Sequence, residues 1–265
     1  MDDSPLLPDA EIGHYRSVLD TSGFPLQAKI QNEITSLSRE FGQGWTATIE
    51  EQPWRHPQTG DSGYIDLVAT CDRMRLIIEC KRQLGTSLLF QVPLVVSPYN
   101  ARLRCLSCRV TNQLTPLIQY AWKDCRMAAF DSSVCIIEPK SKGLLETVAS
   151  TAVLSSEALA DQEGQIMASN GEMNPAYYVP VIVTTARLLT WKLPYQNIGI
   201  EDGKVTHNPE MREIKWARLS KPLTIHGFFG EKKASIEDQN SDDIRTVFIV
   251  QAQHLVKFLS TFRIL

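Results

Sequence analysis

Two strand-like runs joined by a short turn constrain this chain most. The runs cover residues 63–70 and 75–82, are rich in apolar and β-branched residues, and are separated by four residues, which is the pattern of a β-hairpin. Pairing the two ends of the turn sets a register that also pairs Asp66 with Glu79. Side chains alternate between faces along a strand, and directly opposite residues share a face. Asp66, Glu79 and Lys81 are therefore expected to converge on one face of the hairpin.

Two opposed carboxylates repel each other, so a purely structural role for the pair is hard to justify unless a positive charge lies between them. Carboxylate oxygens are ligands that Mg²⁺ and Mn²⁺ prefer, with waters and a substrate phosphate completing the coordination shell. Lys81, two residues after Glu79, is suited to orient a water and to offset charge on a phosphate. The pattern predicts a Mg²⁺ or Mn²⁺ site formed by Asp66 and Glu79.

Asp66, a turn and then the run 77–82, IIECKR, resemble the PD-(D/E)xK, or restriction-endonuclease-like, nuclease superfamily, and its Mrr-like members in particular. The resemblance implies a core of a helix, a three-stranded meander, a second helix and a further strand, with the acidic residue on the second strand and ExK on the third. It also implies that the carbonyl of Cys80 joins Asp66 and Glu79 as a metal ligand.

The elements of such a core occur in order along the chain. An amphipathic helix is predicted at 24–41, followed by a strand at 45–50 and then by the hairpin. A long helix is predicted at 144–163, with Gly164 after its end, and a strand at 178–185. The apolar stripe of the first helix consists of Leu26, Ile30, Ile34, Leu37 and Phe41.

Two assignments of the second half of the core stay open. One takes 24–83 and 144–193 as the core. The other places the second helix at 117–130 and the final strand at 134–137. Pro180 counts mildly against a central position for the later strand, because proline cannot donate to a ladder.

The sequence thus predicts an α/β fold with a restriction-endonuclease-like core, an inserted β-rich segment at 84–142, and a C-terminal strand and helix at 245–251 and 254–262. Residues 1–23 are expected to form an N-terminal extension, and 24–265 a single nuclease-like domain.

Two further polar residues are candidates for the site. Many members of the superfamily place another carboxylate on the first helix, and Glu33 lies nearer the centre of the apolar stripe than Glu40. A solvated helix flank explains either residue equally well. Gln83 shares the strand face of Lys81, as a glutamine does in some relatives, although a surface position at a strand end is the simpler interpretation.

Charge and cysteine content limit the partners. The net charge of -3 over 265 residues gives no overall attraction to nucleic acid, so binding requires a local patch. Arg73, Arg75 and Arg82 are the candidates for that patch. The N-terminus lacks the features of a signal peptide and no run is long enough to span a membrane, so a cytoplasmic location with reduced cysteines is expected. The spacing of Cys105 and Cys108 matches a zinc half-site without a second half, which leaves a zinc-binding module as a distant alternative.

The leading functional interpretation is a metal-dependent nuclease, a Mg²⁺-dependent endonuclease-like phosphodiesterase that hydrolyses DNA. The alternative is a catalytically inactive module that keeps the fold and binds nucleic acid or a protein partner. The sequence leaves open whether the substrate is DNA or RNA, whether the chain forms a homodimer, and whether it acts in restriction, repair or phage defence.

Overall fold

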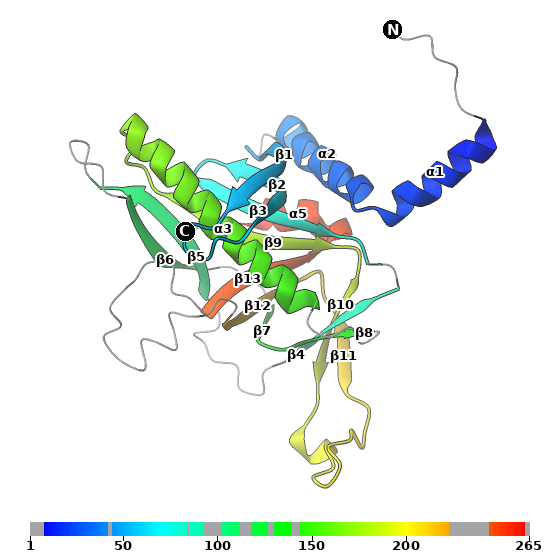
Figure 1. Ribbon diagram of the computed structural model, residues 1–265. Coiled ribbons are helices and arrows are strands. Elements are labelled where there is room, and N and C mark those ends of the chain that lie inside the picture. Colours follow the sequence, from blue (N-terminus) through cyan, green and yellow to red (C-terminus); the bar gives the residue numbers. More distant parts are fainter. Residues whose placement is uncertain are drawn as a thin grey trace.

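The computed structural model describes residues 8–41, 44–83, 85–92, 102–111, 118–126, 130–138, 144–222 and 244–262. These residues form a mixed α/β structure with two mixed β-sheets and four α-helices (Figure 1). The helices are α1 (Asp9–Thr21), α2 (Phe24–Phe41), α3 (Leu144–Asn170) and α5 (Leu255–Thr261), with short 3₁₀ helices at Tyr195–Asn197 and Ala252–His254. No helix among the described residues is both long and apolar enough to cross a membrane.

The larger sheet has nine strands and begins with the antiparallel meander that the sequence predicts. The meander is followed in space by strands that run parallel to its third strand. The spatial order is β1 (Thr46–Arg55), β2 (Ser62–Cys71), β3 (Met74–Lys81), β9 (Ala176–Thr184), β13 (Ile244–Gln251), β12 (Trp216–Pro222) and β7 (Phe130–Ser132), while β5 (Arg102–Val110) pairs with β9 and with β6 (Ile118–Arg126).

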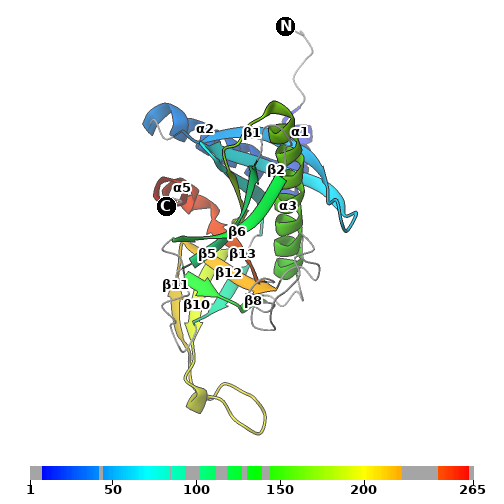
Figure 2. The same ribbon diagram turned by 90° about the vertical axis from the view of Figure 1, so that its left-hand side faces the viewer.

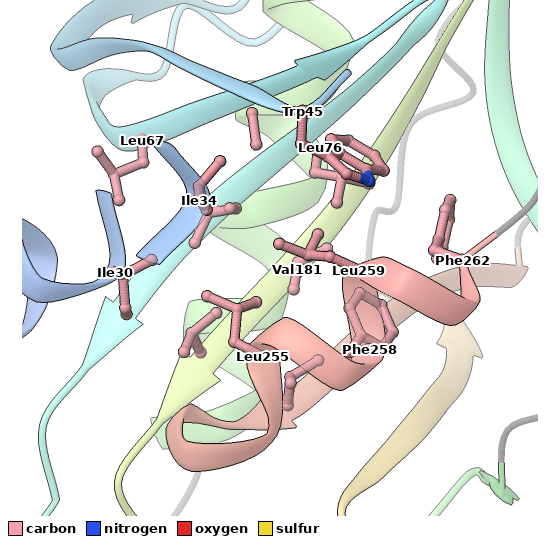
Figure 3. Packing of buried hydrophobic residues seen from close by; sticks show 14 of the residues in the cluster. Ile30, Ile34, Trp45, Leu67, Leu76, Val181, Leu255, Phe258, Leu259 and Phe262 are labelled. Carbon is pink, nitrogen blue, oxygen red and sulfur yellow. The ribbon is translucent and has the colours of Figure 1, made fainter. Parts of the chain in front are cut away.

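Helices cover both faces of this sheet. Figure 2 shows α3 against one face, with α2 and α5 on the other. The alternation of side chains along β3 accounts for both contacts. Leu76 and Ile78 pack in the cluster under α2 and α5, whereas Ile77 packs in the cluster under α3. The first of these clusters includes Ile30, Ile34 and Leu37 from α2, so the middle of the stripe predicted for the 24–41 helix is buried (Figure 3).

A four-stranded sheet lies beside the larger one, and its strands come from both sides of α3 in the sequence. An arm between two of its strands closes with the bridge Ile198 to Val205, and Gly203 in its turn has a φ of 65° that favours glycine. The spatial order is β11 (Glu210–Glu213), β10 (Arg187–Lys192), β4 (Ser87–Gln91) and β8 (Cys135–Glu138).

Most of the elements expected from the sequence are present. The helix at 24–41 and the hairpin agree with α2, β2 and β3, and the C-terminal strand and helix agree with β13 and α5. The helix expected at 117–130 is wrong, since β6 occupies Ile118–Arg126 and pairs along its length with β5. Tertiary pairing outweighs local helix propensity there.

The expected end of the long helix at Gly164 is also wrong, because α3 continues to Asn170. Glu163 bonds Arg75 and Tyr178, and Met167 is buried in the cluster under α3. These contacts on both sides of Gly164 offset the roughly 1 kcal/mol that a glycine costs inside a helix.

Pro180 does not keep its strand out of the centre, because β9 lies between β3 and β13. Tyr177 donates its N–H to the Arg73 carbonyl just before β3, and Thr185 donates to the Lys81 carbonyl of β3. Alternation directs the missing N–H of Pro180 to the opposite side. On that side β9 pairs with β5 through residues 176–178 and with β13 through 181–184. Pro180 lies between these segments, where the ladder needs no donor.

Candidate functional site

The hairpin register agrees with the sequence prediction over its paired residues, which stop one position short of Asp66 and Glu79. Paired residues of β2 and β3 run from Cys71 with Met74 to Leu67 with Ile78. Asp66 and Glu79 are the next residues along each strand. The turn between the strands is closed by Asp72, whose φ of 50° lies in the left-handed region that aspartate tolerates better than most residues.

Strands β2 and β3 separate at the level of Asp66. The Cys80 N–H donates to Asp66 Oδ2 at 2.6 Å, instead of to a backbone carbonyl of β2. The N–H and C=O of one strand residue point to the same side, so the Cys80 carbonyl also faces β2. On the other side of β2, Glu51 of β1 has a φ of 52° and falls between two paired segments. The β2–β3 ladder therefore ends, and β1 is locally irregular, where the acidic residues lie.

Glu79 is buried, with 4% of its surface exposed, and one of its oxygens has no partner among the residues that the structure describes. Lys81 Nζ donates to Glu79 Oε2 at 3.2 Å, while Oε1 accepts no hydrogen bond within the described residues. Burial, and then the charge of Asp66, raise the pKa of Glu79 to about 7 against the lowering effect of Lys81. The Lys81 side chain is 37% exposed, so the site reaches the molecular surface.

These groups fit a divalent cation. Within the described ranges, no three His, Cys, Asp or Glu side chains are placed to hold a metal ion, so the available ligands are two carboxylates and the Cys80 carbonyl. One or two carboxylates, with waters and substrate phosphates, make up the usual shell of Mg²⁺ in proteins. A cation near Glu79 Oε1 would give that oxygen a partner and lower the pKa of Glu79.

The other polar residues predicted for the site, Gln83, Glu33 and Glu40, differ in their surroundings. Gln83 lies beside the end of β9, where its N–H donates to Thr185 Oγ1 at 2.8 Å, and its buried Oε1 has no partner within the described residues. Glu33 is partly exposed and forms an ion pair with Lys29 one turn earlier on α2. The side chain of Glu40 lies outside the described parts of the structure.

The three arginines are not gathered around the carboxylates. Arg73 and Arg75 lie at the turn end of β3, roughly 26 and 20 Å along the chain direction from Lys81 at about 3.3 Å per residue. Arg73 donates to Asn174, and Arg75 is bound to Glu163 of α3. Arg82 follows Lys81 directly and is half-buried. Only Arg82 is adjacent to the site.

Sequence reasoning missed Gln27, which brings α2 to the site. Its Nε2 donates to the backbone carbonyl of Asp66 at 2.8 Å. On a helical wheel Gln27 lies as far from the centre of the apolar stripe as Glu33, on the opposite flank. That symmetry is a signal in the sequence, although a neutral side chain on a helix flank is equally well explained by contact with solvent.

A scan against protein-family models and searches of curated proteins and of solved structures found no match to this chain.

Proposed function

We propose that this protein is a metal-dependent nuclease that hydrolyses phosphodiester bonds in DNA, with Asp66, Glu79 and Lys81 at its catalytic site. The observation that carries the proposal is the buried Glu79 oxygen that has no partner in the described parts of the chain, beside a second carboxylate and a lysine. A buried polar atom is normally satisfied, so an oxygen left open in an acidic pair is suited to a ligand.

The order of elements supports the same proposal. Helix α2, the meander β1 to β3, helix α3 and strand β9 follow one another around the site, and β9 runs parallel to β3 in the sheet. This is the order expected of a restriction-endonuclease-like core, with β4 to β8 between the third strand and the second helix.

Each residue has a distinct role in the proposed site. Asp66, Glu79 and the Cys80 carbonyl would hold Mg²⁺ or Mn²⁺, which when bound supplies positive charge to a phosphate oxygen and lowers the pKa of a water. Lys81, held by Glu79 and partly exposed, positions the attacking water and offsets negative charge on the phosphate. Gln83 and Arg82 extend the site along the end of β3, where they would contact the nucleic-acid backbone.

Cleavage of plasmid DNA with millimolar Mg²⁺, with and without EDTA, tests the proposal. Lys81→Ala and Asp66→Asn should each reduce cleavage by about 100-fold or more, while Lys81→Ala largely spares DNA binding because many phosphate contacts share the affinity. Lys204→Ala is the matched control, since Lys204 is exposed on the β10–β11 arm and pairs only with Asp202 among the described residues.

A parallel incubation with RNA of the same length decides the substrate. If wild type cleaves neither nucleic acid with Mg²⁺ or Mn²⁺, and its melting temperature does not respond to either cation, the nuclease proposal fails. Retained DNA binding in that case would identify the inactive binding module.

A further inference from the structure

Asp66 is held in place at two points, one on its backbone and one on its side chain. The backbone carbonyl accepts from Gln27 Nε2 at 2.8 Å, and the carboxylate accepts from the Cys80 N–H at 2.6 Å. These contacts come from different elements, α2 and β3. Neither is part of a regular strand ladder, because the paired residues of β2 and β3 end at Leu67 with Ile78.

We propose that Gln27 is a positioning residue that fixes Asp66 for cation binding. This inference rests on the proposed function. It states that a neutral side chain of α2 orients Asp66, a proposed metal ligand that lies beyond the last β2–β3 pair. Gln27 does not touch the reacting atoms. It acts through the Asp66 backbone.

The surroundings of Asp66 explain why an outside anchor is needed. The pairs between β1 and β2 include Glu50 with Leu67 and Gln52 with Ile65, and Glu51 between them has a φ of 52°. Asp66 lies opposite this irregular residue, at the point where the paired residues of β2 and β3 end. The side chain of Gln27 supplies the donor that a neighbouring strand would otherwise provide.

Burial makes this anchor effective. Gln27 is 8% exposed, so water competes poorly for the Asp66 carbonyl, and a hydrogen bond in such surroundings is stronger than one in solvent. Glu33, the other flank residue of α2, is bound to Lys29 on its own helix. The connection between α2 and the acidic pair that the structure describes therefore passes through Gln27.

Residues that orient a metal ligand without touching the metal typically contribute 10- to 100-fold to metal affinity. Loss of the Gln27 donor should let the peptide at Asp66 rotate. The carboxylate would then spend less time on the Cys80 N–H and less time in position for a cation. Both effects are measurable, and the first needs no metal.

The test is Gln27→Met, which keeps the length of the side chain and removes the donor, studied in the full chain. Without metal, hydrogen exchange at the Cys80 amide should become about tenfold faster or more, while exchange at Ile78, inside the ladder, stays unchanged. With Mn²⁺ as the probe, the dissociation constant should rise by about 10- to 100-fold.

Gln31→Met is the matched control. Gln31 lies one turn further along α2, and its side chain makes no hydrogen bond within the described residues, so neither measurement should change. If the methionine variant does not fold, Gln27→Ala removes the same donor with a good helix former.

The outcomes separate the two proposals. An unchanged Cys80 exchange rate in the folded Gln27 variant would overturn the positioning role, whatever happens to metal affinity. Wild type that binds no Mn²⁺ would overturn the proposed function and the metal part of this inference together. Faster Cys80 exchange with weaker Mn²⁺ binding supports both.

Discussion

Two buried carboxylates in this protein have opposite surroundings. Glu157 of α3 is 1% exposed and both of its oxygens have partners, because Oε2 bonds His56 Nε2 at 3.2 Å and Oε1 accepts from Arg245 Nε at 3.3 Å. Glu79 is 4% exposed, and one of its oxygens has no partner among the described residues. A carboxylate with two partners stabilises the fold, whereas one with an open oxygen is available to a ligand.

The pairing at Glu157 extends to the protonation of His56. The Thr59 N–H donates to His56 Nδ1 at 3.1 Å, so Nδ1 carries no proton in this arrangement and Nε2 is the donor to Glu157. Arg245 supplies the positive charge that balances the carboxylate. His56, Glu157 and Arg245 thus connect the end of β1, helix α3 and strand β13, which are far apart in the sequence.

The largest expected effect is on the fold, at Glu157. Glu157→Gln removes the negative charge that faces buried Arg245 and turns an NH₂ group toward one of two donors. We expect a loss of about 3 to 5 kcal/mol in the free energy of unfolding, because removing one partner of a buried ion pair is strongly destabilising. Denaturant unfolding at pH 7 measures it.

Glu213→Gln is the control for this prediction. Its ion pair with Arg187 is exposed, with 49% of the Glu213 side chain accessible, so the loss should stay below about 1 kcal/mol. Equal losses of unfolding free energy in the two variants would contradict the prediction that the buried ion pair contributes more to stability than the exposed one.

A smaller effect is expected at Glu79, where the charged form of the carboxylate lowers the free energy of unfolding. Its pKa is raised from 4.5 to about 7 in the folded protein, so the folded state keeps a proton that the unfolded chain has lost between these pH values. The free energy of unfolding should therefore fall by about 3 kcal/mol as the pH rises from 4.5 to 7, and stay level above that. Glu79→Gln should lack this decrease.

Unfolding of both proteins in EDTA, measured from pH 4.5 to 8, checks the prediction. The difference between the curves isolates Glu79 from other titrating groups. With millimolar Mg²⁺, wild type should regain stability at high pH while the glutamine variant gains little. If the free energy of unfolding varies with pH in the same way for wild type and Glu79→Gln in EDTA, the charge of Glu79 is balanced by its surroundings, as that of Glu157 is.

The sequence was sufficient where the determinants are local. The β2–β3 register follows from a short turn and from alternation, so Asp66 and Glu79 could be placed at equivalent levels of two neighbouring strands. The burial of α2 follows from the spacing of its apolar residues, such as Ile30 and Ile34. These features depend on neighbours within one or two elements.

The sequence was insufficient where the partner is distant or chemically ordinary. His56 and Arg245 lie 101 and 88 residues from Glu157, and no spacing rule connects them. Gln27 is a neutral residue that bonds a backbone carbonyl, which leaves no charge pattern to find. The strand that contains Pro180 does not reveal its neighbours, and the change of partner beside β9 removes the need for the missing N–H.

The smallest predicted effect concerns Glu163, a carboxylate intermediate between the other two. It is 27% exposed and accepts from Arg75 Nε at 3.2 Å and from Tyr178 Oη at 2.8 Å. The Tyr178 ring is fully buried, and burial, followed by the charge of Glu163, raises the pKa of its hydroxyl. Tyr178 is therefore a neutral donor at neutral pH.

Tyr178→Phe removes this donor and leaves the ring packing intact. Glu163 keeps Arg75 and its contact with water, so we expect a loss of only about 1 kcal/mol in the free energy of unfolding. Tyr177→Phe is the control, because the Tyr177 hydroxyl has no partner within the described residues, and it should change stability by no more than about 0.5 kcal/mol. Denaturant unfolding of both variants measures the difference. A loss near that of Glu157→Gln would mean that water does not replace the tyrosine, and that Glu163 belongs with the fully paired carboxylate despite its exposure.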